Sequence, residues 1–150
     1  MSAPFDPSQI FATFDMKAVD THTFDDQLNA PGDDLRCVFF WGKDCFNCDI
    51  FKKTALSQVD AIRALALTWF HADVYADEPL GRRFGLHGVP AFFLFRNGKR
   101  LGRVTGWPGL GQFSAAIAKL NAAYAATDAA ESATASATTE STVGTSGSPR

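Results

Sequence analysis

Two stretches of the chain are almost wholly apolar and are bounded by polar or turn-forming residues. Residues 35–41 read LRCVFFW and residues 91–95 read AFFLF. Short apolar runs rich in β-branched and aromatic residues are typical of strands that are buried on both faces. The pattern therefore predicts two strands at the centre of a sheet.

Three shorter segments predict the rest of the sheet. FDMKAV (14–19) and LTWFHADV (67–74) each contain enough apolar residues for a further strand. After the strand at 91–95, an Asn-Gly pair at 97–98 is the strongest short hairpin signal, and LGRVT (101–105) follows it. We therefore expect 101–105 to pair antiparallel with 91–95.

Helical spacing separates these strands. Phe24 and Leu28 share one helical face, and Asp77 is placed to cap a short helix with Pro79 in its first turn. The chain after Cys45 predicts one long amphipathic helix, with Lys52 among its polar positions. Its apolar positions recur at steps of three and four: Cys48, Phe51, Ala55, Val59, Ile62 and Ala66. A closing helix is predicted by the stripe Phe113, Ile117, Leu120 and Tyr124.

The predicted elements alternate as strand, helix, strand, helix, strand, helix, β-hairpin and closing helix. This order predicts an α/β fold, with a central mixed sheet of four to five strands flanked by helices on both faces. We expect one domain at 16–126, because 150 residues suit a single core. Residues 1–15 predict an arm that docks on the core without being part of it. Residues 127–150 hold one large apolar residue, Val143, and predict a disordered tail.

The overall composition narrows the classes of partner. A formal net charge of −2 gives no excess of basic groups, which disfavours nucleic acid. No apolar run approaches the roughly 20 residues of a membrane span, so we expect no membrane contact. The N-terminal residues lack the basic leader and apolar block of a secretory signal peptide, and we therefore expect a cytoplasmic protein. We expect it to be a monomer.

Two of the three cysteines, Cys45 and Cys48, lie three positions apart between the first central strand and the long helix. Such a pair serves as a metal clip, a structural disulfide or a redox-active dithiol, and a reducing cytoplasm disfavours the structural disulfide. Cys45 stands at the predicted helix start, where unpaired N–H groups and the helix dipole favour a thiolate. Lowering a thiol pKa from about 8.5 to about 7 raises the thiolate fraction at pH 7 from about 3% to about half.

The two sulfurs are expected to differ in exposure and acidity. Cys48 lies one helical turn further along, on the apolar face, so it should be less exposed and less acidic than Cys45. The difference predicts that Cys45 attacks a substrate disulfide to form a mixed disulfide, and that Cys48 then attacks Cys45 and releases the substrate. The third cysteine, Cys37, shares the alternation of the central strand and is expected to be a buried small hydrophobic residue.

Residues 16–126 resemble the thioredoxin family through three motifs. FWGKDCFNC (40–48) resembles the family's Phe-Trp-Ala-x-x-Cys-x-x-Cys, GLHGVP (85–90) its Gly-Ile-x-Gly-Ile-Pro loop, and LFRNGKRLGRVTG (94–106) the hairpin that ends in a glycine. The resemblance implies the thioredoxin fold and a protein-disulfide oxidoreductase that needs no cofactor and no metal. It also implies disulfide-bearing proteins or peptides as substrates, and a reductase or oxidase that recycles the cysteine pair.

The resemblance also implies a substrate groove around the cysteines. A cis Val89–Pro90 bond is implied, with Pro90 packed against the sulfurs as part of the catalytic site. The main-chain N–H and C=O of Val89 would pair with an extended substrate segment. Further candidate substrate-binding residues are Trp41 and Gly106 by resemblance, and the apolar Phe46 and the exposed aromatic Trp107 by their positions beside the motifs. Trp41 is equally consistent with a core residue, and Gly106 with a backbone position that needs glycine.

Several positions depart from the family pattern. Phe39 stands where thioredoxins have a buried aspartate that ferries the proton of the resolving cysteine, and His71 aligns, within one residue, with the lysine that accompanies it. His71 is therefore a candidate acid or base, with a structural histidine as the alternative. Lys53 replaces a helix-kinking proline, which predicts a straighter helix. Phe46-Asn47 replaces Gly-Pro between the cysteines, so the preferred direction of exchange stays open.

Two other functions fit parts of the pattern. The first is a thioredoxin-fold module that binds a peptide or protein and carries a non-catalytic or sensory cysteine pair. The second is zinc binding through Cys45 and Cys48, which needs two further ligands, so His71, His87 or Cys37 would have to converge on them. The surroundings of the two sulfurs separate these hypotheses.

Overall fold

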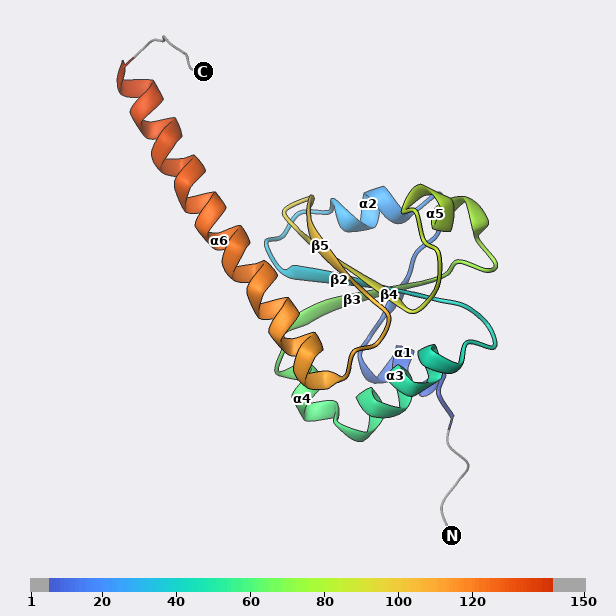
Figure 1. Ribbon diagram of the computed structural model, residues 1–150. Helices are drawn as coiled ribbons and strands as arrows, with labels where there is room; N and C mark the ends of the chain where they lie inside the picture. The colour runs from blue at the N-terminus through green and yellow to red at the C-terminus, as the bar shows by residue number, and fades with distance from the viewer. Residues whose placement is uncertain (1–5, 142–150) are drawn as a thin grey trace.

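The computed structural model describes the backbone of residues 6–141 and the side chains of residues 6–127. Five strands form one sheet in the order β1-β3-β2-β4-β5 (Figure 1). They are β1 (Lys17–Ala18), β2 (Leu35–Trp41), β3 (Leu67–Asp73), β4 (Ala91–Arg96) and β5 (Lys99–Thr105). β1, β3 and β2 run parallel, whereas β4 is antiparallel to β2 and β5 to β4. The predicted mixed sheet is confirmed.

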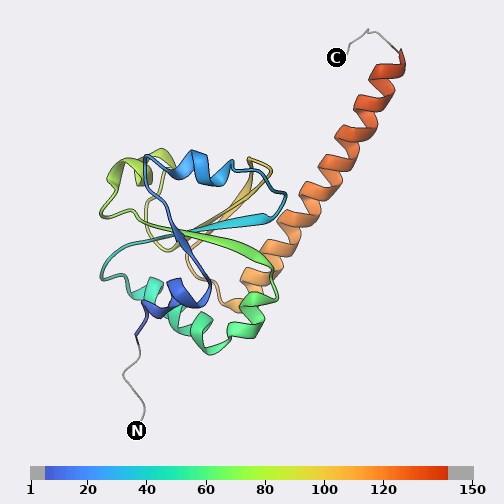
Figure 2. The same ribbon diagram turned by 180° about the vertical axis from the view of Figure 1, so that it is seen from behind.

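Helices cover both faces of the sheet, as predicted. They are α1 (Gln9–Thr13), α2 (Phe24–Leu28), α3 (Phe46–Ser57), α4 (Val59–Arg63), α5 (Glu78–Arg83) and α6 (Leu110–Ser141). α1, α3, α4 and the start of α6 pack on one face, and α2 and α5 on the other (Figures 1 and 2). The sheet thus separates two apolar clusters, one on each side.

The central strand β2 belongs to both clusters. Cys37 and Phe39 point towards α3, and Val38 and Phe40 point towards α2 and α5; all four are fully buried. Alternate side chains of a strand face opposite sides of its sheet, so an unbroken apolar run fits a strand covered on both faces. The expectation for 35–41 is confirmed.

The hairpin and the short helix α5 also form where their turn chemistry predicts. Asn97 (φ 53°) and Gly98 (φ 75°) both adopt the left-handed conformation that a two-residue hairpin turn requires. At the start of α5, the Asp77 carboxylate accepts a hydrogen bond from the Leu80 N–H at 3.3 Å. Asn97 and Gly98 thus supply the backbone angles of the turn, and Asp77 pairs with an N–H that the helix itself leaves without an acceptor.

The prediction of a single long helix after Cys45 is wrong, because the helix divides into α3 and α4 at Gln58; α3 runs without a break through Lys53, where a straighter helix is predicted. At Gln58 the backbone leaves the helical region (φ −134°, ψ 50°). The Ser57 hydroxyl donates a hydrogen bond to the Thr54 carbonyl at 2.9 Å. Bonds of this kind compete with the helix ladder and bend helices. The polar residues at this point therefore end α3, and α4 still buries Ile62 against the core.

The N-terminal segment contributes more to the core than the sequence predicts. Ile10 on α1 is fully buried, and Phe14 is 8% exposed; both belong to the same cluster as Phe51 and Phe113. The prediction of an arm outside the core is therefore wrong for these two residues. Residues 1–5 of the expected arm lie outside the described residues.

Helix α6 continues past the expected domain end at residue 126. Its backbone is helical through 141, where the sequence predicts a disordered tail, and residues 142–150 lie outside the described part. Figure 1 shows the later turns of α6 extending away from the sheet. The placing of the domain boundaries at residues 15 and 126 stays a prediction. Within residues 6–141, no helix combines the length and apolar character required to cross a membrane.

Removing the side chain of Ile10 tests whether α1 is part of the core. We expect Ile10→Ala to lower the free energy of unfolding by about 2–5 kcal/mol, because it leaves a cavity in a fully buried site. Urea denaturation measures this change. Gln9→Ala, at an exposed neighbour in the same helix, is the matched control. Equal stability of the two variants would show that α1 does not support the core.

Candidate functional site

Cys45 joins the end of β2 to the start of α3. It is the N-cap of α3, with extended backbone angles (φ −98°, ψ 110°), and its Sγ accepts a hydrogen bond from the Cys48 N–H at 3.1 Å. Asp44 before it adopts a left-handed conformation (φ 60°), which turns the chain into the helix. Cys45 and Cys48 form a disulfide, and their Cα atoms are 5.2 Å apart. The expected bridging geometry is confirmed.

The two sulfurs have unequal environments. Cys48 is fully buried in the cluster below α3, whereas Cys45 is half-buried and reaches the surface. Between them, Phe46 is 77% exposed and Asn47 is also exposed. Only Cys45 is therefore open to a partner molecule, as the spacing predicts.

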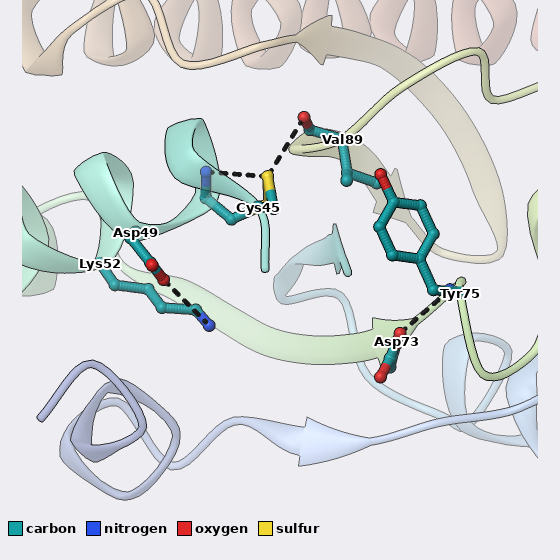
Figure 3. The surroundings of a disulfide bond; sticks show 7 residues. Cys45, Asp49, Lys52, Asp73, Tyr75 and Val89 are labelled. Atoms are coloured by element: carbon teal, nitrogen blue, oxygen red, sulfur yellow. Dashed lines mark hydrogen bonds and ion pairs between the residues drawn. A yellow bond between two sulfur atoms is a disulfide. The ribbon is translucent and has the colours of Figure 1, made fainter. Parts of the chain in front are cut away.

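The loop before β4 lies directly against Cys45. The Val89–Pro90 peptide bond is cis, and the carbonyl oxygen of Val89 is 3.5 Å from Cys45 Sγ (Figure 3). On the other side of the proline, the Gly106 N–H donates to the Pro90 carbonyl at 2.8 Å. Gly106 has φ +77°, a conformation that favours glycine. The sequence-predicted Cys45, Val89, Pro90 and Gly106 thus come together in one place.

Comparison of the sequence with known protein families agrees with this arrangement. A family model described as a thioredoxin-like domain matches residues 29–121. The chain belongs to the thioredoxin-like family. The resemblance seen in the motifs is thereby confirmed, and the match covers the cysteine pair, the Val-Pro loop and the hairpin. No curated protein sequence matches the chain.

Solved structures share the fold at low identity. Thioredoxin f2 of Chlamydomonas reinhardtii has a TM-score of 0.55 at 21% identity, over 69% of this chain and 94% of its own. Thioredoxin f of spinach chloroplast gives 0.58 at 22%, over 71% and 93%. The thioredoxin of Malassezia sympodialis gives 0.54 at 21%, over 69% and 89%. These likenesses show the thioredoxin fold, and this fold with a cysteine pair supports thiol–disulfide oxidoreductase chemistry in general.

Within this family fold, Trp41 is held by contacts on the α3 side of the sheet. Its indole N–H donates to His71 Nδ1 at 3.1 Å, and the His71 ring stacks on Phe11 with centroids 4.0 Å apart. Lys52 Nζ lies 4.5 Å from the centroid of the Trp41 ring. It is also 4.0 Å from Asp49 Oδ1, the contact drawn in Figure 3. Trp41 is half-buried and anchored, and its expected contact with substrate stays a prediction.

Burial determines the charges in this cluster. Burial, together with a smaller contribution from the nearby Lys52 charge, lowers the pKa of His71 from 6.5 to about 4. Burial also lowers the pKa of Lys52, although Asp49 and Asp73 oppose the change. Neutral His71 is therefore the form present near pH 7, and its Nδ1 serves as the acceptor for Trp41.

The contacts of His71 give little support to the hypothesis that it replaces the missing proton carrier beneath Cys48. Phe39 and His71 do pair across β2 and β3, as the alignment implies. The Phe39 ring, however, is fully buried against Phe51 and Phe92, at centroid distances of 4.8 and 5.4 Å. His71 points its Nδ1 to Trp41 and its face to Phe11, which is the structural role proposed as the alternative.

The two remaining aromatic candidates differ in exposure. Phe46 lies open beside Cys45, as expected for an apolar flank of the nucleophile. Trp107 was expected to be exposed, but it is half-buried and packs on Phe51 and Phe113 at 4.8 and 5.2 Å. Its position beside Gly106 places the ring inward, so the expectation of an exposed ring is wrong.

The zinc hypothesis requires further ligands close to Cys45 and Cys48. Among the residues whose side chains are described, no group of three or more His, Cys, Asp and Glu side chains is placed to hold a metal ion. Cys37, one of the suggested ligands, is fully buried, and burial raises the pKa of its thiol well above the ordinary value. Cys37 is therefore a core residue, as the strand alternation predicts.

Two residues at the site were not found from the sequence. Lys52 was assigned to the polar face of the helix, yet only 6% of its surface is exposed. Tyr75 follows β3 and is 58% exposed, with its ring against the backbone of Gly42. The aromatic Tyr75 in a turn next to a strand end was a usable signal, whereas the burial of Lys52 depends on rings from α1 and β2.

The low pKa of His71 predicts a pH-dependent contribution to stability. The folded protein does not take up the proton that the unfolded chain binds below pH 6.5, so stability falls as the pH drops from about 6.5 towards 4. We expect His71→Gln to reduce the loss of unfolding free energy between pH 7 and pH 4.5 by about 1–2 kcal/mol, allowing for solvent screening. Urea titrations at both pH values measure it.

A matched change at the exposed His22 provides the control. His22→Gln should keep the pH dependence of the wild-type protein. If His71→Gln also keeps it, the assigned protonation of His71 is incorrect.

Proposed function

We propose that the protein is a thiol–disulfide oxidoreductase that acts on disulfides in proteins or peptides, with Cys45 as nucleophile and Cys48 as resolving cysteine. One observation carries the proposal. The accessible sulfur of Cys45 sits at the N-terminus of α3 with the Cys48 N–H directed at it, while its bonded partner Cys48 has no exposed surface. A reactive sulfur and a protected one are what a two-step exchange needs.

The first step uses the reduced form of the pair. The Cys45 thiolate attacks one sulfur of the substrate disulfide, forms a mixed disulfide and displaces the second substrate sulfur as a thiolate. The Cys48 N–H and the unpaired donors of the first turn of α3 favour the negative charge on Cys45. Attack therefore starts from the sulfur that is both exposed and stabilised as an anion.

The second step releases the substrate. Cys48 loses its proton and attacks Cys45 Sγ, which forms the Cys45–Cys48 disulfide and expels the remaining substrate thiolate. Cys48 lies in the same buried cluster as Phe39, which offers no carboxylate. We therefore assign the proton of Cys48 to the substrate thiolate displaced in the first step. Two electrons pass from the cysteine pair to the substrate disulfide, which becomes one thiol, carrying the proton of Cys48, and one thiolate that takes a proton from solvent.

Polypeptide substrates are favoured by the main chain beside Cys45. Val89 comes just before the cis proline, and strand β4 begins after that proline. The carbonyl oxygen of Val89 lies next to the reactive sulfur of Cys45. An extended segment can add to such an edge through main-chain hydrogen bonds. Phe46, the next residue after Cys45, provides an exposed apolar side chain for contact with the substrate. A small disulfide would use only part of this surface.

The cycle requires a second protein or dithiol. Net reduction of substrates needs a reductase that returns the Cys45–Cys48 disulfide to the dithiol, and net oxidation needs an oxidase that forms it. About 30 mV in potential corresponds to 1.4 kcal/mol for this two-electron couple, so small contacts at the sulfurs decide the direction. The recycling partner must approach Cys45, because Cys48 is buried.

Cysteine variants test the assigned roles. With dithiothreitol as the recycling dithiol and insulin as the disulfide substrate, Cys45→Ser should reduce insulin no faster than dithiothreitol alone. When reduced beforehand and mixed with insulin in the absence of dithiothreitol, Cys48→Ser should accumulate a covalent mixed disulfide with substrate, because the resolving step is blocked. Non-reducing electrophoresis detects this complex, and added reductant should dissolve it.

Cys37→Ala is the matched control, since Cys37 is buried on β2 away from the exchange. It should retain the wild-type rate. Activity that survives Cys45→Ser, or a wild-type protein that binds peptides without reducing them, would instead favour a binding module with a non-catalytic cysteine pair.

A further inference from the structure

A pocket opens beside the active site between the turn after β3, helix α5 and the loop before β4. Its volume is about 270 Å³, and its apolar lining comes from Val74, Tyr75, Gly81, Leu86 and Val89. Pockets for small organic ligands occupy about 300–1,000 Å³. This pocket is smaller than that range, and it is open on one side, so its size suits one side chain of a polypeptide.

The pocket is continuous with the reactive sulfur through one residue. Val89 lines the pocket, and its carbonyl oxygen is 3.5 Å from Cys45 Sγ. A polypeptide that pairs with the main chain of Val89 therefore has the sulfur on one side and the pocket on the other. Figure 3 shows Cys45, Val89 and Tyr75 in this order.

Tyr75 is held in place although most of its surface faces solvent. Its N–H donates to Asp73 Oδ1 at 3.0 Å, and the N–H of Ala76 donates to the same oxygen at 3.2 Å. The ring lies against Gly42, where any Cβ would overlap it. An exposed aromatic side chain with a fixed base supplies contact area at little cost in conformational entropy. It forms a ready-made wall of the pocket.

The acidic and the basic residue that line the pocket are paired with each other, and the exposed His87 lies at its edge. Glu78 and Arg82 both line the pocket, and their side chains form an ion pair at 3.5 Å with each group largely exposed. A paired, solvated rim offers little attraction to a charged group. The floor is apolar, with Val74 buried and Leu86 and Val89 half-buried. The chemistry therefore favours an uncharged, apolar occupant.

We infer that this Tyr75 pocket is a specificity subsite that receives an apolar side chain of leucine, methionine or phenylalanine size from the substrate polypeptide, one or two residues from its disulfide cysteine. The inference rests on the proposed function, because it defines which disulfides Cys45 attacks fastest. In an extended segment, consecutive residues are about 3.3 Å apart and alternate in direction. A residue one or two positions from the cysteine therefore reaches past Val89 into the pocket.

Peptides with a single cysteine test the subsite. The cysteine is joined as a mixed disulfide to 5-thio-2-nitrobenzoate, and the four flanking positions are serine except for one leucine, placed at each position in turn. The reduced protein is mixed with each peptide under single-turnover conditions. Release of the coloured thiolate gives a second-order rate constant, and each leucine peptide is compared with the all-serine peptide.

We expect one flanking position at which leucine raises the rate constant of the wild-type protein by about tenfold, as for other apolar side-chain pockets. Tyr75→Ala should reduce this ratio to about twofold or less, and Tyr75→Phe should keep it, because the ring forms the wall. Tyr124→Ala is the control. That tyrosine lies on α6, where its hydroxyl accepts a hydrogen bond from Asn97 at 2.8 Å, and the ratio should stay at its wild-type value.

The possible results separate the two proposals. Equal rates for all peptides with the wild-type protein would overturn the subsite and leave the oxidoreductase proposal standing. A leucine preference that survives Tyr75→Ala would place the selectivity elsewhere and also overturn the subsite. No reaction of the wild-type protein with any peptide would overturn both. Thermal unfolding of each variant confirms that the ratios refer to folded protein.

Discussion

Main-chain pairing of β2 with both of its neighbours holds the active site together. Phe40 pairs with Ala72 of β3 on one side and with Ala91 of β4 on the other. The chain segments next to this row carry the loop to Cys45, the turn after β3 and the loop that contains Pro90. A slip of one residue would move every buried side chain of β2 to the opposite face. The same burial that stabilises the sheet therefore sets the distance between the sulfur and the proline loop.

The charges near the site follow from burial too. An ion pair beneath the cysteines would cost several kcal/mol per ion in desolvation, and fully buried Phe39 avoids this cost. Lys52 keeps one buried charge, placed against the ring of Trp41 and near Asp49. A cation–π contact contributes about 0.5–2 kcal/mol, less than the desolvation penalty, which agrees with the lowered pKa of Lys52. Beside this charge, His71 is neutral and fixes the indole N–H of Trp41.

The sequence predicted what local pattern and spacing determine. The central strands, the hairpin turn and the cysteine pair depend on neighbouring residues, and all are confirmed. Other features depend on which distant groups meet. Ile10 is buried because α1 docks on α3, and Lys52 is buried because Phe11 and Trp41 cover it. The inward ring of Trp107 and the pocket wall at Tyr75 arise in the same way, from loops whose course no periodicity describes.

The two sulfurs differ in their access to water. Cys48 is fully buried, and burial disfavours a charged thiolate. In the proposed mechanism Cys48 therefore gives up its proton only to a base that lies next to it. Cys45 has a hydrogen-bond donor of its own, the N–H of Cys48, directed at its Sγ. A hydrogen bond to an anion strengthens as the local dielectric constant falls, so this donor offsets part of the desolvation cost of a Cys45 thiolate when a substrate excludes water. In the proposed mechanism the order of the two attacks therefore follows from burial: Cys45 reacts while it is open to the substrate, and Cys48 reacts only after the displaced thiolate has become available to take its proton.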